Sequence, residues 1–237
     1  MINLLTDKYN WVNEFPWGTT IAPFICNSVR ELVIWNPDGS VEFHEYAGFV
    51  PGWVRDKNWI PVSYTTPYGH GMIISKIAYG YGTFTGICKL PNFKGSWPGF
   101  WLADIYGENT IPPEPDVFEQ FRKDCFFTRF KITTTYHDGP TYETGKAISK
   151  SLYRIYPYDW GWNEIILEWL PESMTTKING RISLKIMKKD YPCYPTGKMN
   201  VLLNSCIGEW KPKISKFPPF IVKTLTYEPY NSGKSDS

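Results

Sequence analysis

Several residue types are scarce in this sequence, and each shortage argues against a class of protein. Its 237 residues include five cysteines and three histidines, and no two cysteines stand at Cys-x-x-Cys spacing. A zinc site or a dense disulfide framework is therefore not expected. We interpret the cysteines mainly as small buried hydrophobic residues, with at most one or two disulfides whose pairing the sequence leaves open. The net charge is +2 and the lysines are scattered, so the basic stripe of a nucleic-acid-binding protein is missing too.

Sequence motifs of several enzyme classes are also absent. The chain has no Gly-x-Ser-x-Gly nucleophile elbow, no P-loop and no dinucleotide-binding fingerprint. No apolar run is long enough to span a membrane, and residues 1–8 lack the charged start and long apolar run of a signal peptide. If the protein acts outside the cell, it uses another export route or a leader has been removed.

What the sequence has in abundance points to β-structure. Phe, Trp and Tyr make up 17% of the residues, and 20 prolines and 19 glycines mark many turns. Aromatic residues favour strands, and their rings can also stack on sugars. A clear turn at residues 36–40 joins residues 31–35 to residues 40–46 in a predicted hairpin.

Further short strands are predicted along the rest of the chain, with a turn at residues 178–180. They cover residues 71–77, 82–90, 97–102, 126–136, 164–170, 181–187, 199–206 and 219–227. Segments 122–130 and 149–156 fit a helix or a strand equally well. Many short strands with little helical periodicity indicate a β-sandwich or β-barrel.

The acidic segment 112–121 has two interpretations. Taken alone it favours a short helix with Pro115 at its first position and Asp116 near its positive end. In a strand, Glu114 and Asp116 share one face, and Glu119 joins them only if a one-residue β-bulge lies between Asp116 and Glu119. Two carboxyl groups about 5–5.5 Å apart suit a retaining glycosidase, with one acting as nucleophile and the other as proton donor.

The flanking sequences resemble those of glycoside hydrolase family 16. Residues 79–91 are similar to a family strand in which a Tyr-Gly pair leads to Lys-Leu-Pro, and residues 95–102 are similar to Trp-Pro-Ala-Phe-Trp-Leu. The acidic segment then matches the family's catalytic pattern Glu-x-Asp-x-x-Glu in its bulged form. Weaker similarities follow downstream, so that the resemblance extends from about residue 40 to residue 227.

The resemblance implies an all-β, concanavalin A-like β-jelly-roll sandwich of two antiparallel sheets with an open concave substrate cleft. One domain would span residues 1–230, and residues 231–237 would form a flexible tail. The implied activity is retaining, endo-acting hydrolysis of internal β-linkages in a polysaccharide. A β-1,3- or β-1,3-1,4-glucan is favoured, and an agar-, porphyran- or carrageenan-type galactan is the other choice.

The resemblance also implies roles for individual residues. Glu114 would be the nucleophile, Asp116 its modulator and Glu119 the general acid/base. The candidate substrate-binding residues are Trp97, Trp101, His137, Asn204 and Trp210. The alternative for the two tryptophans of the 97–102 strand is core packing, and the alternative for the histidine is a structural role.

The sequence departs from the family pattern at several positions. Pro115 replaces an aliphatic residue in the catalytic strand, and Met72 stands where relatives often carry arginine. Residues 153–158 lack the histidine of the family's Phe-His-x-Tyr stretch. The closing strand at residues 221–227 lacks the aspartate that often helps to hold a structural calcium, so we expect no metal and no cofactor.

Two alternatives to an enzyme share this fold. One is a non-catalytic carbohydrate-binding module or lectin, and the other is a glycan-binding protein of a virion or surface assembly. A non-catalytic module would be expected to lack at least one catalytic acid, and all three are present. We expect an extracellular or virion-associated monomer that binds a polysaccharide and neither nucleic acid nor a membrane.

Overall fold

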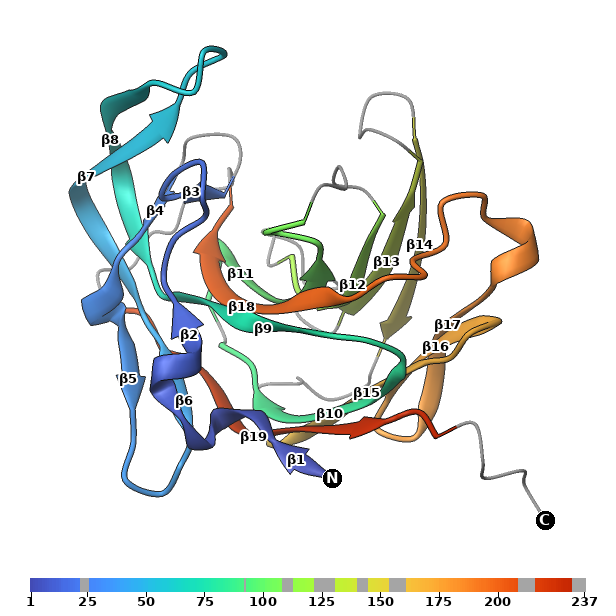
Figure 1. The fold of residues 1–237 in the computed structure, drawn as a ribbon. Coiled ribbons are helices and arrows are strands. Elements are labelled where there is room, and N and C mark those ends of the chain that lie inside the picture. Colours follow the sequence, from blue (N-terminus) through green and yellow to red (C-terminus); the bar gives the residue numbers. More distant parts are fainter. Residues whose placement is uncertain are drawn as a thin grey trace.

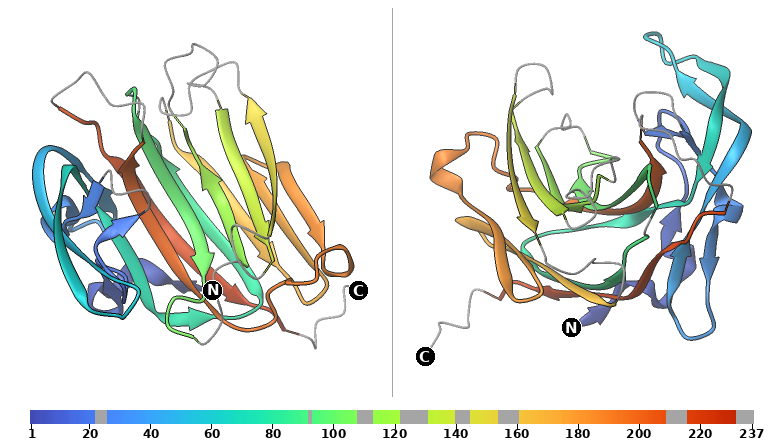
Figure 2. Two further views of the ribbon diagram at one scale, coloured as in Figure 1. Left: turned by 90° about the horizontal axis from the view of Figure 1, so that it is seen from above. Right: turned by 180° about the vertical axis from the view of Figure 1, so that it is seen from behind.

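The computed structural model describes residues 1–21, 26–91, 93–107, 113–121, 131–139, 145–153, 161–208 and 216–231. Regular structure in these ranges is almost entirely β-strand, with a few short 3₁₀ helices. The strands form three sheets. Two of them lie one above the other, and the third rises along one side (Figures 1 and 2). The all-β prediction is confirmed. None of the helices in the described ranges is long and apolar enough to cross a membrane.

The first sheet forms the bottom layer in Figure 1. Its neighbours pair antiparallel. Across the sheet, the strands are β17 (Arg181–Met187), β16 (Ser173–Ile178), β15 (Asn163–Trp169), β10 (Gly82–Lys89), β19 (Phe220–Pro229), β6 (Val41–Phe43) and β5 (Val33–Trp35), with β1 (Ile2–Asn3) pairing β19.

The second sheet is also antiparallel and is curved, with one end of the curve at β14. In order, it contains β14 (Lys146–Tyr153), β13 (Lys131–Asp138), β12 (Glu114–Glu119), β11 (Ser96–Ala103), β18 (Met199–Ile207), β9 (Met72–Tyr79) and β2 (Trp11–Val12). We call the side of this sheet that points away from the first sheet its concave face.

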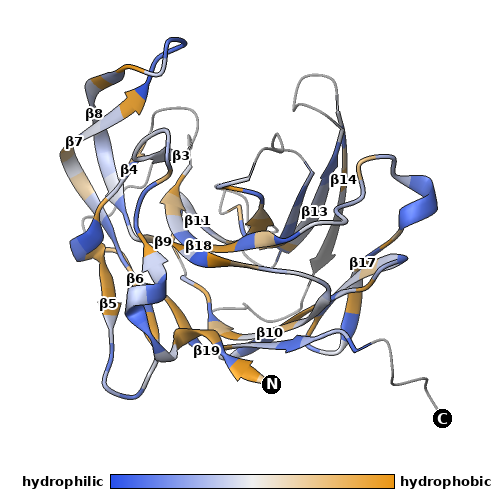
Figure 3. Ribbon diagram, viewed as in Figure 1, coloured by the Kyte–Doolittle hydropathy of each residue, from blue (hydrophilic) through white to orange (hydrophobic). Residues whose placement is uncertain are grey.

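The main core fills the space between these two sheets. Phe84 of β10, Phe100 of β11, Phe118 of β12 and Phe220 of β19 are completely buried in it. The rings of Phe118 and Phe220 meet edge to face with centroids 5.7 Å apart. Because successive side chains of a strand point to opposite faces, burial of Phe100 turns Trp101 onto the concave face. The strands accordingly mix hydrophobic and hydrophilic residues, whereas the 3₁₀ helix η6 (Lys188–Asp190) is hydrophilic (Figure 3).

The third sheet forms a wall beside the concave face (Figure 1). It contains β3 (Thr20–Ile21), β4 (Cys26–Ser28), β8 (Pro61–His70) and β7 (Glu45–Arg55). The chain just before β3 returns to the free edge of β7, where the backbone N–H of Thr19 donates to the Trp53 carbonyl at 3.0 Å. The sheet thereby closes around the buried Asn27, whose side chain donates to the Val50 carbonyl and accepts from the Tyr64 hydroxyl.

The structure confirms most of the predicted strands and corrects others. The hairpin of β5 and β6 is present, but the residues before it form the 3₁₀ helix η3 (Arg30–Leu32) rather than strand. The turn at residues 178–180 has Asn179 and Gly180 at positive φ, yet it joins β16 to β17, and β16 was not predicted. The ambiguous segment 149–156 is strand as far as residue 153, and segment 122–130 lies outside the described residues.

Candidate active site

The acidic segment is the extended strand β12, in the interior of the second sheet, so the helical interpretation is wrong. Its register on β13 pairs Asp116 with Thr135 and Glu119 with Thr133. Between these two pairs, β12 therefore advances by three residues and β13 by only two. This is the predicted one-residue β-bulge, and it returns Glu119 to the face of Asp116.

Pro115 is accommodated at the start of this strand. It pairs in register with Tyr136 on β13, but the pairing of β12 with β11 begins only at Asp116. Proline has no N–H to donate, and here no ladder bond to β11 is required of it. The irregularity of the strand lies instead at the bulge after Asp116.

The three carboxyl groups of β12 meet on the concave face. Glu114 and Asp116 are only 7% and 4% exposed. The carboxyl group of Asp116 forms side-chain hydrogen bonds with those of both Glu114 and Glu119. Asp116 is therefore the bridge between the two glutamates. Because the three carboxyl groups are hydrogen-bonded neighbours, they cannot all be ionised without a large electrostatic cost.

Burial dominates the protonation of these acids. It raises the pKa of Glu119 to about 7, against opposing hydrogen bonds from Trp97 and Asp116. The pKa of Asp116 lies well above its ordinary value, because the group is buried and faces the charges of Glu119 and Glu114. A carboxylic acid that keeps its proton near neutral pH can act as a general acid.

His137 is the cross-strand neighbour of Glu114 on β13. Its Nε2 lies 3.1 Å from Oδ2 of Asp116 and 3.9 Å from Oε1 of Glu114. Burial lowers the pKa of His137, so the neutral imidazole is favoured. The structure thus brings the predicted histidine into contact with the acids, where it orients Asp116.

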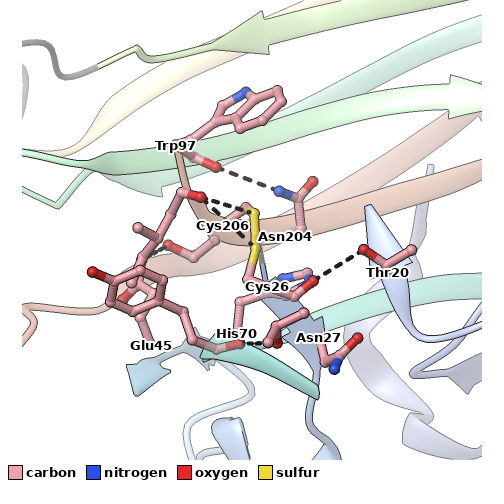
Figure 4. Close-up of a disulfide and its surroundings, with 12 residues drawn as sticks. Thr20, Cys26, Asn27, Glu45, His70, Trp97, Asn204 and Cys206 are labelled. Atoms are coloured by element: carbon pink, nitrogen blue, oxygen red, sulfur yellow. Dashed lines mark hydrogen bonds between the residues drawn. A yellow bond between two sulfur atoms is a disulfide. The ribbon is translucent and has the colours of Figure 1, made fainter. Parts of the chain in front are cut away.

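Two tryptophans of β11 lie on the same face. The indole N–H of Trp97 donates to Oε1 of Glu119 at 2.8 Å. The indole N–H of Trp101 donates to Oδ1 of Asn204 at 2.9 Å, and the Asn204 amide in turn donates to the Trp97 backbone carbonyl at 3.4 Å. Figure 4 shows this last bond. Each tryptophan is partly exposed, whereas Asn204 is buried. Trp210 lies outside the described residues.

A second hydrophobic cluster covers part of the concave face next to Trp101, and the sequence did not reveal it. Met72 of β9 is completely buried in it, together with Phe15 and with Leu202 of β18. The ring of Phe15 stacks on Trp17 with centroids 4.8 Å apart and lies 6.1 Å from Trp101. Trp101 therefore has both a packing role and an exposed edge. An arginine in place of Met72 would bury a charge here.

Two groups of side chains among the described residues have the spacing of metal ligands. Glu114, Asp116 and His137 form one, and Cys26, His70 and Cys206 form the other. In each group the possible ligand atoms lie within 4.8 Å of one another. The first is the acid cluster itself, in which Asp116 is hydrogen-bonded to both glutamates.

The chain is an antiparallel jelly-roll sandwich that carries a hydrogen-bonded row of acids on its concave face. Comparison with solved structures shows which known proteins share this fold. A glycoside hydrolase family 16 endo-glucanase from Bacteroides ovatus superposes with a TM-score of 0.74 at 15% identity, covering 94% of this chain and 96% of that one. The laminarinase catalytic domain of Thermotoga maritima MSB8 gives 0.72 at 17% identity, covering 95% and 94%.

The κ-carrageenase of Pseudoalteromonas carrageenovora gives a TM-score of 0.66 at 14% identity, covering 89% of this chain and 87% of that one. In sequence, the chain is 29% identical over 143 residues to the endo-1,3-1,4-β-glycanase EglC of Rhizobium meliloti strain 1021, a match that covers 60% of this chain. That match covers 28% of the length of EglC. No family model matches the sequence. The resemblance to glycoside hydrolase family 16 is confirmed, and the chain has the jelly-roll fold of its members.

Proposed function

We propose that this chain is a retaining endo-glycoside hydrolase that cleaves internal β-linkages of a polysaccharide. One structural relationship carries the proposal: Asp116 bridges Glu114 and Glu119, and burial raises the pKa of Glu119 to about 7. The favoured substrate is a β-1,3- or mixed β-1,3-1,4-glucan. The names of the laminarinase and of the endo-1,3-1,4-β-glycanase support that choice, and the carrageenase keeps a galactan as the other choice.

The proposed reaction is a double displacement. The ionised carboxylate of Glu114 attacks the anomeric carbon while Glu119 gives its proton to the departing glycosidic oxygen, and a covalent glycosyl–enzyme forms. A water molecule then replaces the leaving sugar. Glu119, now ionised, removes a proton from that water, which attacks the anomeric carbon and releases Glu114.

The other residues of the site position these two acids. Asp116 retains a proton because of its raised pKa and can donate it to the carboxylate of Glu114, which fixes the orientation of the nucleophile. Trp97 holds Oε1 of Glu119. An inverting enzyme would need about 6.5–9.5 Å between its two carboxyl groups to admit a water. Glu114 and Glu119 both hydrogen-bond the same intervening carboxyl group, and we therefore propose the shorter separation of a retaining enzyme.

The test is hydrolysis of laminarin, lichenan, agarose, porphyran and carrageenan, followed by release of reducing ends. We expect one of them to be cleaved and Glu114→Gln to abolish cleavage without changing the fold. Glu172→Gln is the matched control, because the Glu172 side chain is 76% exposed and the residue lies between β15 and β16 of the first sheet. Proton NMR of the first product should show the β-anomer. Full activity of Glu114→Gln, or an initial α-anomer, would contradict the proposal.

A glycan-binding protein without activity is the second candidate. Met72 favours it, since the cluster of Met72, Phe15 and Trp17 covers a part of the concave face where the family resemblance leads us to expect an arginine. This candidate requires calorimetric binding to one glycan of the panel with no release of reducing ends from it.

A further inference from the structure

A second group of reactive side chains lies where the third sheet meets the second. Cys26 of β4 and Cys206 of β18 form a disulfide across 180 residues of sequence, and His70 at the end of β8 lies beside it (Figure 4). All three residues are at most 1% exposed. Both cysteines are buried, as expected, and they form one of the one or two disulfides that the sequence allowed without fixing the pairing.

The ligand atoms of this group converge. The two sulfur atoms and a ring nitrogen of His70 all lie within 4.8 Å of one another. One ring nitrogen of His70, Nδ1, lies 3.3 Å from the Gly71 carbonyl oxygen. The other ring nitrogen, Nε2, has no hydrogen-bond partner. A completely buried ring nitrogen without a partner is costly unless something else satisfies it.

A buried carboxyl group lies on the strand next to His70, outside the group whose ligand atoms converge within 4.8 Å. Glu45 on β7 is the cross-strand neighbour of His70. Its Oε1 accepts a hydrogen bond from the hydroxyl of Ser205, the residue before Cys206, while Oε2 has no partner. Nε2 of His70 and Oε2 of Glu45 are thus two buried polar atoms on neighbouring strands without a hydrogen-bond partner, and of these two residues only His70 belongs to the group that converges on the two sulfur atoms.

We propose that the reduced protein binds one Zn²⁺ at this place through Cys26, Cys206 and His70, with Glu45 as the candidate fourth ligand. A dithiol or phosphine reductant supplies two electrons, and two protons convert the disulfide to two thiols. Binding of Zn²⁺ to both sulfur atoms then releases two protons. Zinc prefers thiolate and imidazole ligands, and a buried site with four protein ligands is typical of its structural role.

The proposed Zn²⁺ and the disulfide would have the same structural role, the metal under reducing conditions and the disulfide under oxidising conditions. Each ties the third sheet to β18, so the wall beside the concave face stays attached when the disulfide is reduced. Cys206 pairs in register with Trp97, whose indole N–H bonds Glu119. One strand, β11, therefore separates the tie on β18 from the proposed acid on β12. Binding of Zn²⁺ at this place does not depend on the proposed hydrolytic activity.

Cobalt titration of the reduced full-length chain is the direct test. The background should carry Cys125→Ser and Cys193→Ser, since other thiols also bind Co²⁺, whereas Cys88 is buried and can stay. After reduction with a phosphine and removal of metal, we expect one equivalent of Co²⁺ to give thiolate-to-cobalt charge-transfer absorption that Zn²⁺ abolishes. The oxidised protein should give none.

Two variants and the metal–ligand distances from X-ray absorption test whether the metal binds at this site. His70→Gln should weaken Co²⁺ binding at least tenfold, whereas His44→Gln, at a half-buried histidine that bonds Glu42 instead, should not. If His70→Gln fails to fold, X-ray absorption of the zinc-loaded parent still decides, with two sulfur neighbours expected at about 2.3 Å and nitrogen at about 2.0–2.1 Å. Absence of a cobalt signal, equal affinity of a folded His70→Gln, or a zinc shell without sulfur would overturn the proposal.

Discussion

The indole N–H of Trp97 donates a hydrogen bond of 2.8 Å to Oε1 of Glu119. This bond favours the ionised carboxylate and lowers the pKa of Glu119, in opposition to the larger effect of burial, which raises the pKa. Trp97 thus limits how far burial can raise the pKa of the proposed acid.

Replacing Trp97 with phenylalanine should shift the pH profile of hydrolysis. Loss of the hydrogen bond should raise the pKa of Glu119 above its value of about 7. A general acid works only while protonated, so the alkaline limb of kcat/KM should move to higher pH even as the maximal rate falls. The measurement is the pH dependence of kcat/KM on whichever polysaccharide the protein cleaves.

Trp101→Phe is the matched control for this variant. Trp101 lies on the same strand and face, but its indole N–H bonds Asn204 rather than an acid. Its removal should change affinity and leave the alkaline limb in place. A limb that moves to lower pH in Trp97→Phe would show that the bond does not act on Glu119 as described.

Asp116→Asn should uncouple the two glutamates. The amide can still donate a hydrogen bond to Glu114, but unlike the carboxyl group it does not take up or release a proton. We expect kcat to fall on the order of 10²-fold with little change in KM. His137→Gln should have a smaller effect, because His137 reaches Glu114 only at 3.9 Å and acts mainly on Asp116. Equal rates for Asp116→Asn and the parent would exclude a modulating role.

The concave-face residues were predictable because they lie close together in sequence or in recognisable motifs. Glu114, Asp116 and Glu119 span six residues of β12, and the pattern of the flanking strands decided between helix and strand. The bulge could be postulated from the spacing alone, but its place depends on the register with β13, which sequence periodicity does not encode.

The third sheet could not be predicted for different reasons. Pro51, Pro61 and Pro67 lie within β7 and β8, where they weaken the strand signal, and these strands pair at the side of the sandwich rather than within it. The link between Cys26 and Cys206 joins residues 180 positions apart. No local pattern in a sequence specifies contacts of that separation.

Gly52 of β7 should tolerate no side chain. A Cβ placed there would lie 2.3 Å from the amide nitrogen of Asn27, the buried residue around which the third sheet closes. Gly52→Ala must push Asn27 away from its partners, so we expect a loss of roughly 2 kcal/mol in the free energy of unfolding, measured by urea denaturation. Gly161→Ala, at a site with nothing within 4 Å of the added carbon, is the control and should be nearly neutral.

The proposed acid should make the protein less stable at neutral pH than it would otherwise be. The pKa of Glu119 is about 7 in the folded protein, against 4.5 for the unperturbed group. A group with a raised folded pKa stabilises the fold fully below its unfolded value, and this contribution is lost as pH rises through the folded value. Glu119→Gln stays neutral at every pH, and its Oε1 can still accept from Trp97.

The stability difference between Glu119→Gln and the parent should therefore depend on pH in a defined way. It should be small at pH 4, increase between pH 4.5 and 7, and level off above that at about 3 kcal/mol in favour of the variant. Urea denaturation at pH 4, 5.5, 7 and 8 measures it, with Glu172→Gln as the exposed control that should show no such rise. A difference that stays flat or shrinks with pH would mean that Glu119 ionises normally. It would then lack the proton that acid catalysis requires, so this stability measurement also tests the mechanism without any substrate.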